Sequence, residues 1–185
     1  MNMQPDQALI RGCKEGDKDA FDGIYSRYSS VMYGICLRYA RDREEAQDLL
    51  QEGFIRVYER IHQYSGEGSF EGWMRRLFVN LALDAYKKKK RESEQVLAFA
   101  AEMVPEEDDN PWPAVSEKEL VEMIRQLPEG YRMVFNLFAV EGFSHKQIAA
   151  QLGISESTSK TQFFKARKQL RQQVEALVRK TSDLR

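Results

Sequence analysis

Residues 144–170 read SHKQIAAQLGISESTSKTQFFKARKQL, and this stretch has the layout of two helices joined by a tight turn. Ser144-x-x-Gln147 forms a capping box, which predicts that a short helix begins there. Gly153 suits the left-handed position of a turn, and Ser155 is a good N-cap for a second helix. A short helix, a turn with glycine and a longer basic helix are typical of a helix-turn-helix. An ordinary helical hairpin is the alternative interpretation.

Two phenylalanines are adjacent in the second of these helices, so their side chains point about 100° apart. Phe163 belongs to an apolar stripe with Ala166, Leu170 and Val174, which predicts a core position. Phe164 lies on the polar face, which a recognition helix presents to the major groove. Contact with another domain is the alternative for Phe164. The other members of this face are Lys160, Thr161, Lys165 and Lys168.

Three longer helical patterns precede this region. The first spans about residues 21–39, and Asp42-x-x-Glu45 resembles a capping box that opens the second. The third begins near Ser69, after the loop HQYSGEGS of residues 62–69, and its lysines crowd the C-terminal end. There the helix dipole favours cations. The stripes predicted to face inward include Tyr25, Tyr58 and Ala85.

The helical pattern stops near residue 92. The segment VPEEDDNPWP contains three prolines and four consecutive acids, which indicates a linker. Order resumes at the capping box Ser116-x-x-Glu119, and no segment shows convincing strand alternation. The sequence therefore predicts an all-α protein with two helical domains, residues 1–92 and 116–185, joined by an acidic linker over 93–115.

The net charge of −1 conceals a strong pattern along the chain. Residues 71–91 hold seven cations against two carboxylates, and residues 143–180 hold eight against two. Between them, residues 92–122 hold ten acids against one lysine. Two separated basic blocks favour two contacts with nucleic acid. The alternative is a set of solvated helix faces around a disordered acidic linker.

Several classes of protein are disfavoured. No run of about 18 apolar residues could cross a membrane, and the N-terminus lacks a signal-peptide layout, so we expect no membrane insertion. Cys13 and Cys36 are predicted to be reduced thiols in a cytoplasmic protein. The chain has no P-loop, no HExxH and no metal-spaced Cys/His cluster. We therefore predict no catalytic residue, no metal and no cofactor.

Two parts of the chain resemble a known family. LPEGYRMVFNLFAVEGFSHKQIAAQLGISESTSKTQFFKARKQL resembles the C-terminal domain of bacterial extracytoplasmic-function (ECF) sigma factors. EEAQDLLQEGFIRVYERI and FEGWMRRLFVNLALDAYKKKKR resemble their N-terminal domain. The two matches occur in the right order and cover about residues 5–175. The resemblance implies a transcription initiation factor that binds core RNA polymerase, directs it to certain promoters and helps to open the DNA.

The resemblance also implies a docking surface on the second helix. Asp48, Gln51 and Glu52 match the family's docking motif for core polymerase. The sequence agrees independently, because these residues avoid the apolar stripe and share a polar face that could meet a basic partner. Without the resemblance, a simple solvated face is the favoured interpretation.

The resemblance further assigns the third helix and the loop before it to the minus-ten promoter element. Holding unpaired bases needs a flexible loop, small pockets, aromatic rings and cations for the backbone. Arg76, Asn80 and Asp84 recur every four residues and share one face. The residues implied here are Gly66, Ser69, Phe70, Arg76, Asn80, Asp84, Lys87 and Lys88.

The helix-turn-helix would contact the minus-thirty-five element. Ser157, Ser159 and Gln162 differ from the family's usual glycine, valine and arginine, so its base preference is not carried over. The residues implied for this contact are Ser144, Gln147, Ser155, Thr158, Lys160, Thr161, Phe164, Lys165 and Lys168.

The expected partners are core RNA polymerase and promoter DNA, with an anti-sigma factor as a further candidate because many relatives are held by one. The acidic linker is expected to enter a basic channel of the polymerase, as the family's linker does. Two other functions stay open from the residues alone. One is a stand-alone helix-turn-helix regulator with an N-terminal sensing domain, and the other is a helical adaptor that binds only proteins.

Overall fold

The computed structural model describes residues 5–93 and 115–182, and every regular element in these ranges is helical. This confirms the all-α class. The chain divides into two compact units, Met1–Ala85 and Tyr86–Arg185, and the division falls inside the fourth helix, earlier than the predicted boundary at residue 92. The predicted acidic linker falls on residues 94–114 for most of its length, and these lie outside the described residues.

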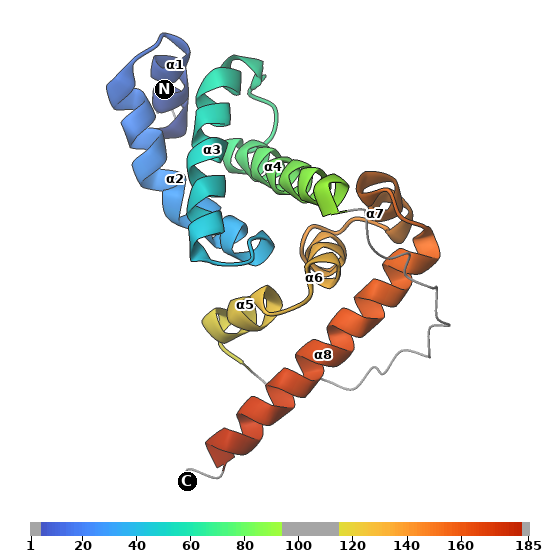
Figure 1. Cartoon of the computed structure of the whole chain (residues 1–185). Coiled ribbons are helices and arrows are strands. Elements are labelled where there is room, and N and C mark those ends of the chain that lie inside the picture. The colour runs from blue at the N-terminus through green and yellow to red at the C-terminus, as the bar shows by residue number, and fades with distance from the viewer. Residues whose placement is uncertain (1–4, 94–114, 183–185) are drawn as a thin grey trace. The chain divides into compact units, whose positions relative to one another are not determined.

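Four helices build the N-terminal part of the chain (Figure 1). Helix α1 lies against α2, and α2 lies against α3. A short 3₁₀ turn, η1, ends α3 and leads into the loop before α4. The bounds are α1 Pro5–Lys14, α2 Lys18–Tyr39, α3 Arg43–Arg60, η1 Ile61–Gln63 and α4 Phe70–Ser93.

The first core forms where the apolar stripes of α2, α3 and α4 meet. Side chains with almost no exposed surface include Met32, Ile35, Val57, Met74 and Phe78. Burying each of these side chains contributes about 1.5–3 kcal/mol relative to leaving it in water. This core fixes the faces of α3 and α4 that remain outside.

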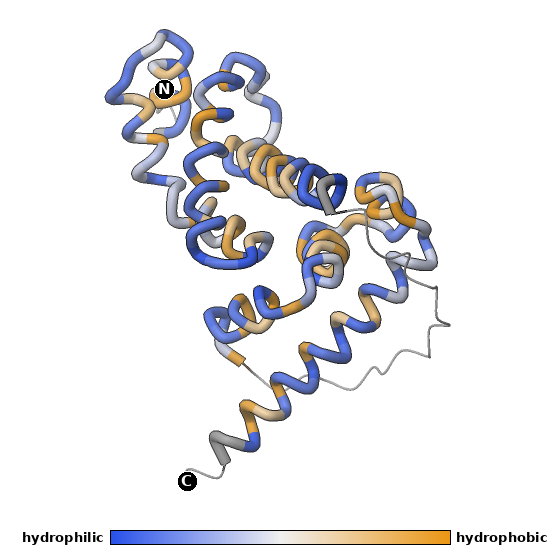
Figure 2. The backbone as a smooth tube through the Cα atoms, in the orientation of Figure 1, coloured by the Kyte–Doolittle hydropathy of each residue, from blue (hydrophilic) through white to orange (hydrophobic). Residues whose placement is uncertain are grey.

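Three positions predicted to face inward are instead exposed. Tyr25 and Tyr58 keep 41% and 49% of their surface accessible, because each ring lies at the edge of the contact between α2 and α3. Ala85 is exposed because α4 has left the core by then: none of its described side chains after Leu83 is buried. Figure 2 shows the corresponding change from apolar to polar residues along α4.

The second unit packs three short helices and a π-helical segment along one long helix. Helices α5, α6 and α7 all contact α8, and the buried cluster between α5 and α8 is Ile124, Leu127, Ala166 and Leu170. Gly142, with φ of 76°, follows the π-helical segment. The bounds are α5 Glu117–Arg125, α6 Glu129–Phe135, η2 Asn136–Val140, α7 His145–Leu152 and α8 Glu156–Ser182.

A buried arginine fixes the corner between α5 and α6. Arg132 is 3% exposed, and its Nη1 donates to the carbonyl oxygens of Arg125 at 2.8 Å and Leu127 at 3.2 Å. These carbonyls lie at the end of α5, where a helix leaves acceptors unsatisfied and favours a cation. The sequence pattern does not single out this residue.

Candidate nucleic-acid and partner interfaces

Helix α3 presents an acidic face to solvent. Asp48, Gln51 and Glu52 are all exposed, as their position off the apolar stripe predicts. Ile55 lies on the same face and keeps 53% of its surface exposed. Sequence reasoning missed Ile55. The signal that could have found it is its spacing, three residues after Glu52 and seven after Asp48.

An arginine ties this acidic face to α4. The Nε of Arg56 lies 3.1 Å from Oε1 of Glu52, and its Nη1 lies 3.3 Å from Oδ2 of Asp84. The two carboxylates belong to the residues predicted for polymerase docking and for minus-ten DNA, respectively. Since both ion pairs are at the surface, each contributes only about 0.2–1 kcal/mol. Their structural effect is to connect the two faces through one side chain.

Helices α3 and α4 also approach closely at Gly53. A β-carbon at this position would lie 2.6 Å from Cδ1 of Phe78 and closer still to two other ring atoms. Phe78 is 2% exposed, so its ring is enclosed and cannot move into solvent without leaving the core. The absence of a side chain at Gly53 therefore sets the distance between the acidic face of α3 and the outer face of α4.

Gly53→Ala is accordingly expected to destabilise the first unit by about 1–3 kcal/mol. The free-energy cost of overpacking exceeds the gain from the higher helix propensity of alanine. Gly34→Ala is the matched control, since a β-carbon on this α2 glycine meets nothing within 4 Å. It should be neutral or stabilising by about 0.4–1 kcal/mol. Urea unfolding of the full chain measures both, and equal midpoints would contradict the packing argument.

The outer face of α4 carries polar side chains in a line. Arg76, Asn80 and Asp84 are exposed, as their four-residue spacing predicts. Lys88 is exposed and Lys87 is half-buried. The structure therefore brings an amide and several cations onto one helix, where cations suit phosphates and an amide can pair with a base edge.

The loop before α4 is shaped by two glycines. Gly66 and Gly68 have φ of 88° and 72°, a region in which other residues are strained. Ser69 caps α4, because its Oγ accepts a hydrogen bond from the Gly72 N–H at 3.0 Å. Phe70, by contrast, is 5% exposed and stacks on Trp73 with ring centroids 5.6 Å apart. Its ring packs beneath the loop and is not exposed, so it is not available to stack on an unpaired base.

The helix-turn-helix geometry is present in the second unit. Ser144 and Gln147 form both hydrogen bonds of the capping box that begins α7. Gly153 adopts the left-handed conformation with φ of 64°, and the Oγ of Ser155 accepts from the Thr158 N–H at 2.9 Å. Ser144, Gln147 and Ser155, three polar side chains of the predicted minus-thirty-five set, therefore cap helices. The helix N-termini themselves suit phosphate groups.

The predicted reading face of α8 is accessible to different degrees. Lys160 and Lys168 are exposed, whereas Thr161, Phe164 and Lys165 are half-buried. Lys160 pairs with Glu156, Nζ to Oε1 at 2.8 Å, and this pairing lowers the pKa of the Glu156 carboxyl. A DNA phosphate would have to compete with Glu156 for this lysine.

Phe163 points away from this reading face and joins a ring cluster. Its centroid lies 4.5 Å from that of Phe138, 6.0 Å from Phe135 and 5.8 Å from His145. Phe163 is half-buried, so it lies at the edge of the core that its apolar stripe predicts. Nearby, the Nδ1 of His145 lies 2.9 Å from the Oγ of Ser159, a residue with no exposed surface. No pattern in the sequence indicates this polar contact.

Three observations limit the chemistry of the described residues. No group of three or more His, Cys, Asp or Glu side chains in them could hold a metal ion. Burial raises the pKa of the free thiols of Cys13 and Cys36 to about 11 and about 12, so both stay protonated at neutral pH. None of the helices in residues 5–93 and 115–182 has the length and apolar character needed to cross a bilayer.

These features define a helix-turn-helix protein with a second helical domain that exposes both an acidic and a basic face. Family models agree with this class: sigma-70 region 2 matches residues 24–92, and sigma-70 region 4 matches residues 117–170. The ECF RNA polymerase sigma factor SigW of Bacillus subtilis is 32% identical over 91% of this chain and 96% of that protein. The chain belongs to the ECF RNA polymerase sigma factor family.

Other relatives cover the chain to a similar extent. The ECF RNA polymerase sigma-E factor of Haemophilus influenzae is 30% identical over 94% of this chain and 97% of that protein. A solved structure of CnrH in complex with the cytosolic domain of CnrY is 19% identical, covers 94% of this chain and 99% of that chain, and has a TM-score of 0.49. The match to region 2 disfavours a stand-alone regulator with a sensing domain.

Proposed function

We propose that this protein binds core RNA polymerase, directs it to a set of promoters and helps to open the DNA there. The observation that carries the proposal is the joint arrangement of α3 and α4. Helix α3, which carries the acidic face, packs on α4 through Gly53 and Phe78. Helix α4 carries the amide of Asn80 and the cations. One compact unit can therefore hold a protein partner and a DNA strand at the same time.

Docking on polymerase is assigned to Asp48, Gln51 and Glu52, with Ile55 at the C-terminal end of the same face. An exposed aliphatic side chain beside acidic ones offers an interface a small apolar anchor next to polar contacts. The acids would guide encounter with a basic surface, and Ile55 would supply area that is removed from water.

Promoter contacts are assigned to both units. The loop at Gly66 and Ser69 and the α4 face of Arg76 and Asn80 would hold the unpaired minus-ten strand. The α7 and α8 caps would position the second unit on phosphates of the minus-thirty-five duplex, and Thr161, Phe164 and Lys165 would meet base edges. Catalysis of polymerisation would belong to the polymerase, so this protein would need no cofactor of its own. It would act in the cytoplasm, where the polymerase and the promoters are.

Within this scheme, Asn80 and the lysines of α4 should behave differently. Asn80→Ala should lower the preference for the selected minus-ten sequence by about 1–3 kcal/mol, because an amide reads bases. Replacing Lys87 and Lys88 with Gln should weaken binding to all single strands and reduce the salt slope by about 0.7 for each phosphate that is no longer neutralised. Binding of labelled single strands by the holoenzyme, measured across salt concentrations, separates the two effects. If the lysine changes alter preference more than Asn80→Ala does, the assignments are reversed.

The proposal as a whole is tested by co-purification with bacterial core polymerase, followed by transcription from a randomised promoter library. We expect stable capture and enrichment of promoters with two sequence elements. Tight binding of the isolated protein to palindromic duplex without capture of polymerase would favour the stand-alone regulator. The absence of any salt-dependent affinity for DNA would favour the adaptor.

A further inference from the structure

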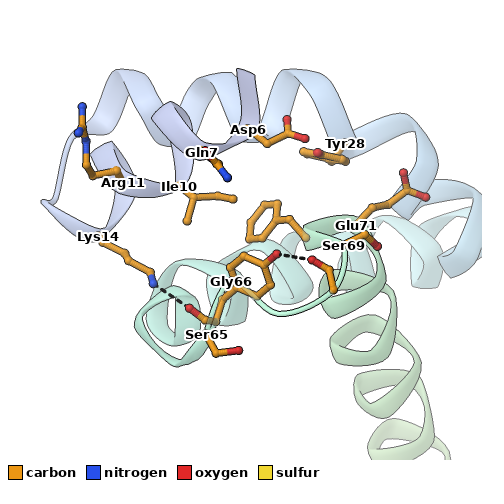
Figure 3. Close-up of a pocket in the computed structure, with 13 residues that line it drawn as sticks. Asp6, Gln7, Ile10, Arg11, Lys14, Tyr28, Ser65, Gly66, Ser69 and Glu71 are labelled. Atoms are coloured by element: carbon orange, nitrogen blue, oxygen red, sulfur yellow. Dashed lines mark hydrogen bonds between the residues drawn. The ribbon is translucent and has the colours of Figure 1, made fainter. Parts of the chain in front are cut away.

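A pocket of about 700 Å³ lies between α1 and the loop that precedes α4 (Figure 3). Lys14 and Ile10 approach it from α1, and Ser65, Gly66 and Ser69 approach it from the loop. The region 2 family model matches from residue 24 onward, so α1 is outside the part of the chain that it describes. The pocket wall thus includes a helix to which no promoter role has been assigned above.

The loop needs external support to hold one conformation. All residues from Ser65 to Ser69 are exposed, and two of them are glycines with positive φ. Glycine loses more conformational entropy on ordering than any other residue, and exposed side chains contribute little packing to offset that loss. A loop with this composition would sample several conformations unless bonds at its base restrain it.

Two hydrogen bonds connect α1 to the far end of this loop. The Nζ of Lys14 donates to the backbone oxygen of Tyr64 at 2.8 Å, across 50 residues of sequence. The hydroxyl of Tyr64 donates in turn to the backbone oxygen of Gly68 at 2.8 Å. The ring of Tyr64 is anchored against Phe70 and Trp73, at centroid distances of 5.2 and 5.7 Å. Both bonds appear as dashed lines in Figure 3.

We propose that Lys14 is a positioning residue for the loop before α4, residues 62–69. Its ammonium group fixes the Tyr64 carbonyl, and the Tyr64 hydroxyl then fixes the Gly68 carbonyl. The inference rests on the proposed function, in which Gly66 and Ser69 contact the unpaired minus-ten strand. A bond from a charged donor is about twice as strong as a neutral one, so one lysine can restrain the loop. A loop held in one conformation makes its base contacts in every complex, whereas the phosphate contacts of the α4 lysines do not depend on the loop, so Lys14 increases discrimination between bases without touching DNA.

The restraint of this loop by Lys14 is measured by hydrogen exchange of the full chain without polymerase. Lys14→Met should speed exchange of the loop amides in residues 62–69 by about tenfold, the effect of losing one charge-assisted hydrogen bond. Exchange in α3 and the middle of α4 should not change. Lys14→Arg keeps a cationic donor and should retain most of the protection. Lys18→Met, an exposed lysine at the start of α2, is the control for lost charge. Unchanged loop exchange in Lys14→Met would overturn the proposal.

The effect on promoter choice is measured by selecting randomised single-stranded DNA with the holoenzyme. Lys14→Met should lower the enrichment of the preferred bases about three- to tenfold, with polymerase capture unchanged and with rescue by Lys14→Arg. A reduced salt slope with unchanged preference would mean that Lys14 contacts phosphate, and this would overturn the positioning role. Loss of polymerase capture together with faster exchange throughout the first unit would also overturn it, since Lys14 would then be a general stabiliser.

The two measurements keep this inference separate from the proposed function. If the unmodified protein neither captures polymerase nor enriches any DNA sequence, the proposed function fails. The exchange of the loop amides still shows whether Lys14 holds the loop. If the loop loosens in Lys14→Met and the selected sequences remain the same, the proposed function stands and the role of Lys14 is refuted.

Discussion

Asp48→Arg combined with Glu52→Arg is expected to abolish capture of core RNA polymerase. The two substitutions change the charge of the α3 face by four units beside the exposed Ile55, so attraction to a basic partner surface becomes repulsion. Hot-spot residues of an interface cost about 2 kcal/mol or more each when they are truncated, and reversal of charge adds an unfavourable contact. A loss of at least a hundredfold in affinity is therefore expected.

Stability should change little in this double variant. Both side chains are exposed, and the structural loss is the Arg56–Glu52 ion pair, worth about 0.2–1 kcal/mol. Glu15→Arg with Asp22→Arg gives the same change in net charge at exposed positions outside α3 and is the matched control. Co-purification, far-ultraviolet circular dichroism and thermal melting together check the prediction. Undiminished capture by the double variant would refute the docking assignment.

Phe163→Ala should destabilise the second unit by about 3 kcal/mol, the lower end of the range for losing a phenylalanine from a core. The lower end is expected because the ring is half-buried, although it packs against Phe135, Phe138 and His145. A unit of this size has little stability to spare, so α6 and α8 should exchange their amide hydrogens markedly faster.

Phe164→Ala is the matched comparison, because it removes an identical ring one position away. Its effect on stability should stay within about 1 kcal/mol. It should instead lower activity at promoters that depend on the minus-thirty-five element, since removing one base contact costs about 1–3 kcal/mol. Hydrogen exchange of the full chain and transcription from selected promoters measure the pair. If Phe164→Ala loosens the unit and Phe163→Ala affects only DNA binding, α8 is rotated from the orientation used here.

Local signals in the sequence were sufficient to predict where several helices begin and which of their faces are buried. The capping boxes at Ser116 and Ser144 and the left-handed turn at Gly153 depend on residues within a few positions of one another, so local chemistry decides them. Asp42 shows the limit of this rule. Its carboxylate caps α3 as predicted, because it accepts a hydrogen bond from the Glu45 N–H. The Glu45 carboxylate, however, accepts a hydrogen bond from the Arg41 N–H, whereas a capping box would use the Asp42 N–H.

The separation of Phe163 from Phe164 was likewise determined by the sequence, because the helical repeat turns adjacent side chains about 100° apart. The exposure of Asp48, Gln51 and Glu52 followed from the same repeat. Periodicity cannot show where a stripe leaves the core, so the pattern predicts inward positions for Tyr25, Tyr58 and Ala85, which are exposed in the fold.

Tertiary structure alone decided the contacts between residues far apart in the chain. Gly53 meets the ring of Phe78, Arg56 joins Glu52 to Asp84, His145 satisfies the buried hydroxyl of Ser159, and Lys14 reaches the carbonyl of Tyr64. Each depends on the distance and rotation at which two helices pack, and these are set by the fit of whole apolar faces. A periodic pattern specifies which face of a helix is buried. It does not specify which residue of the neighbouring helix lies opposite a given atom, and this is why the contact between Lys14 and Tyr64 is visible only in the folded chain.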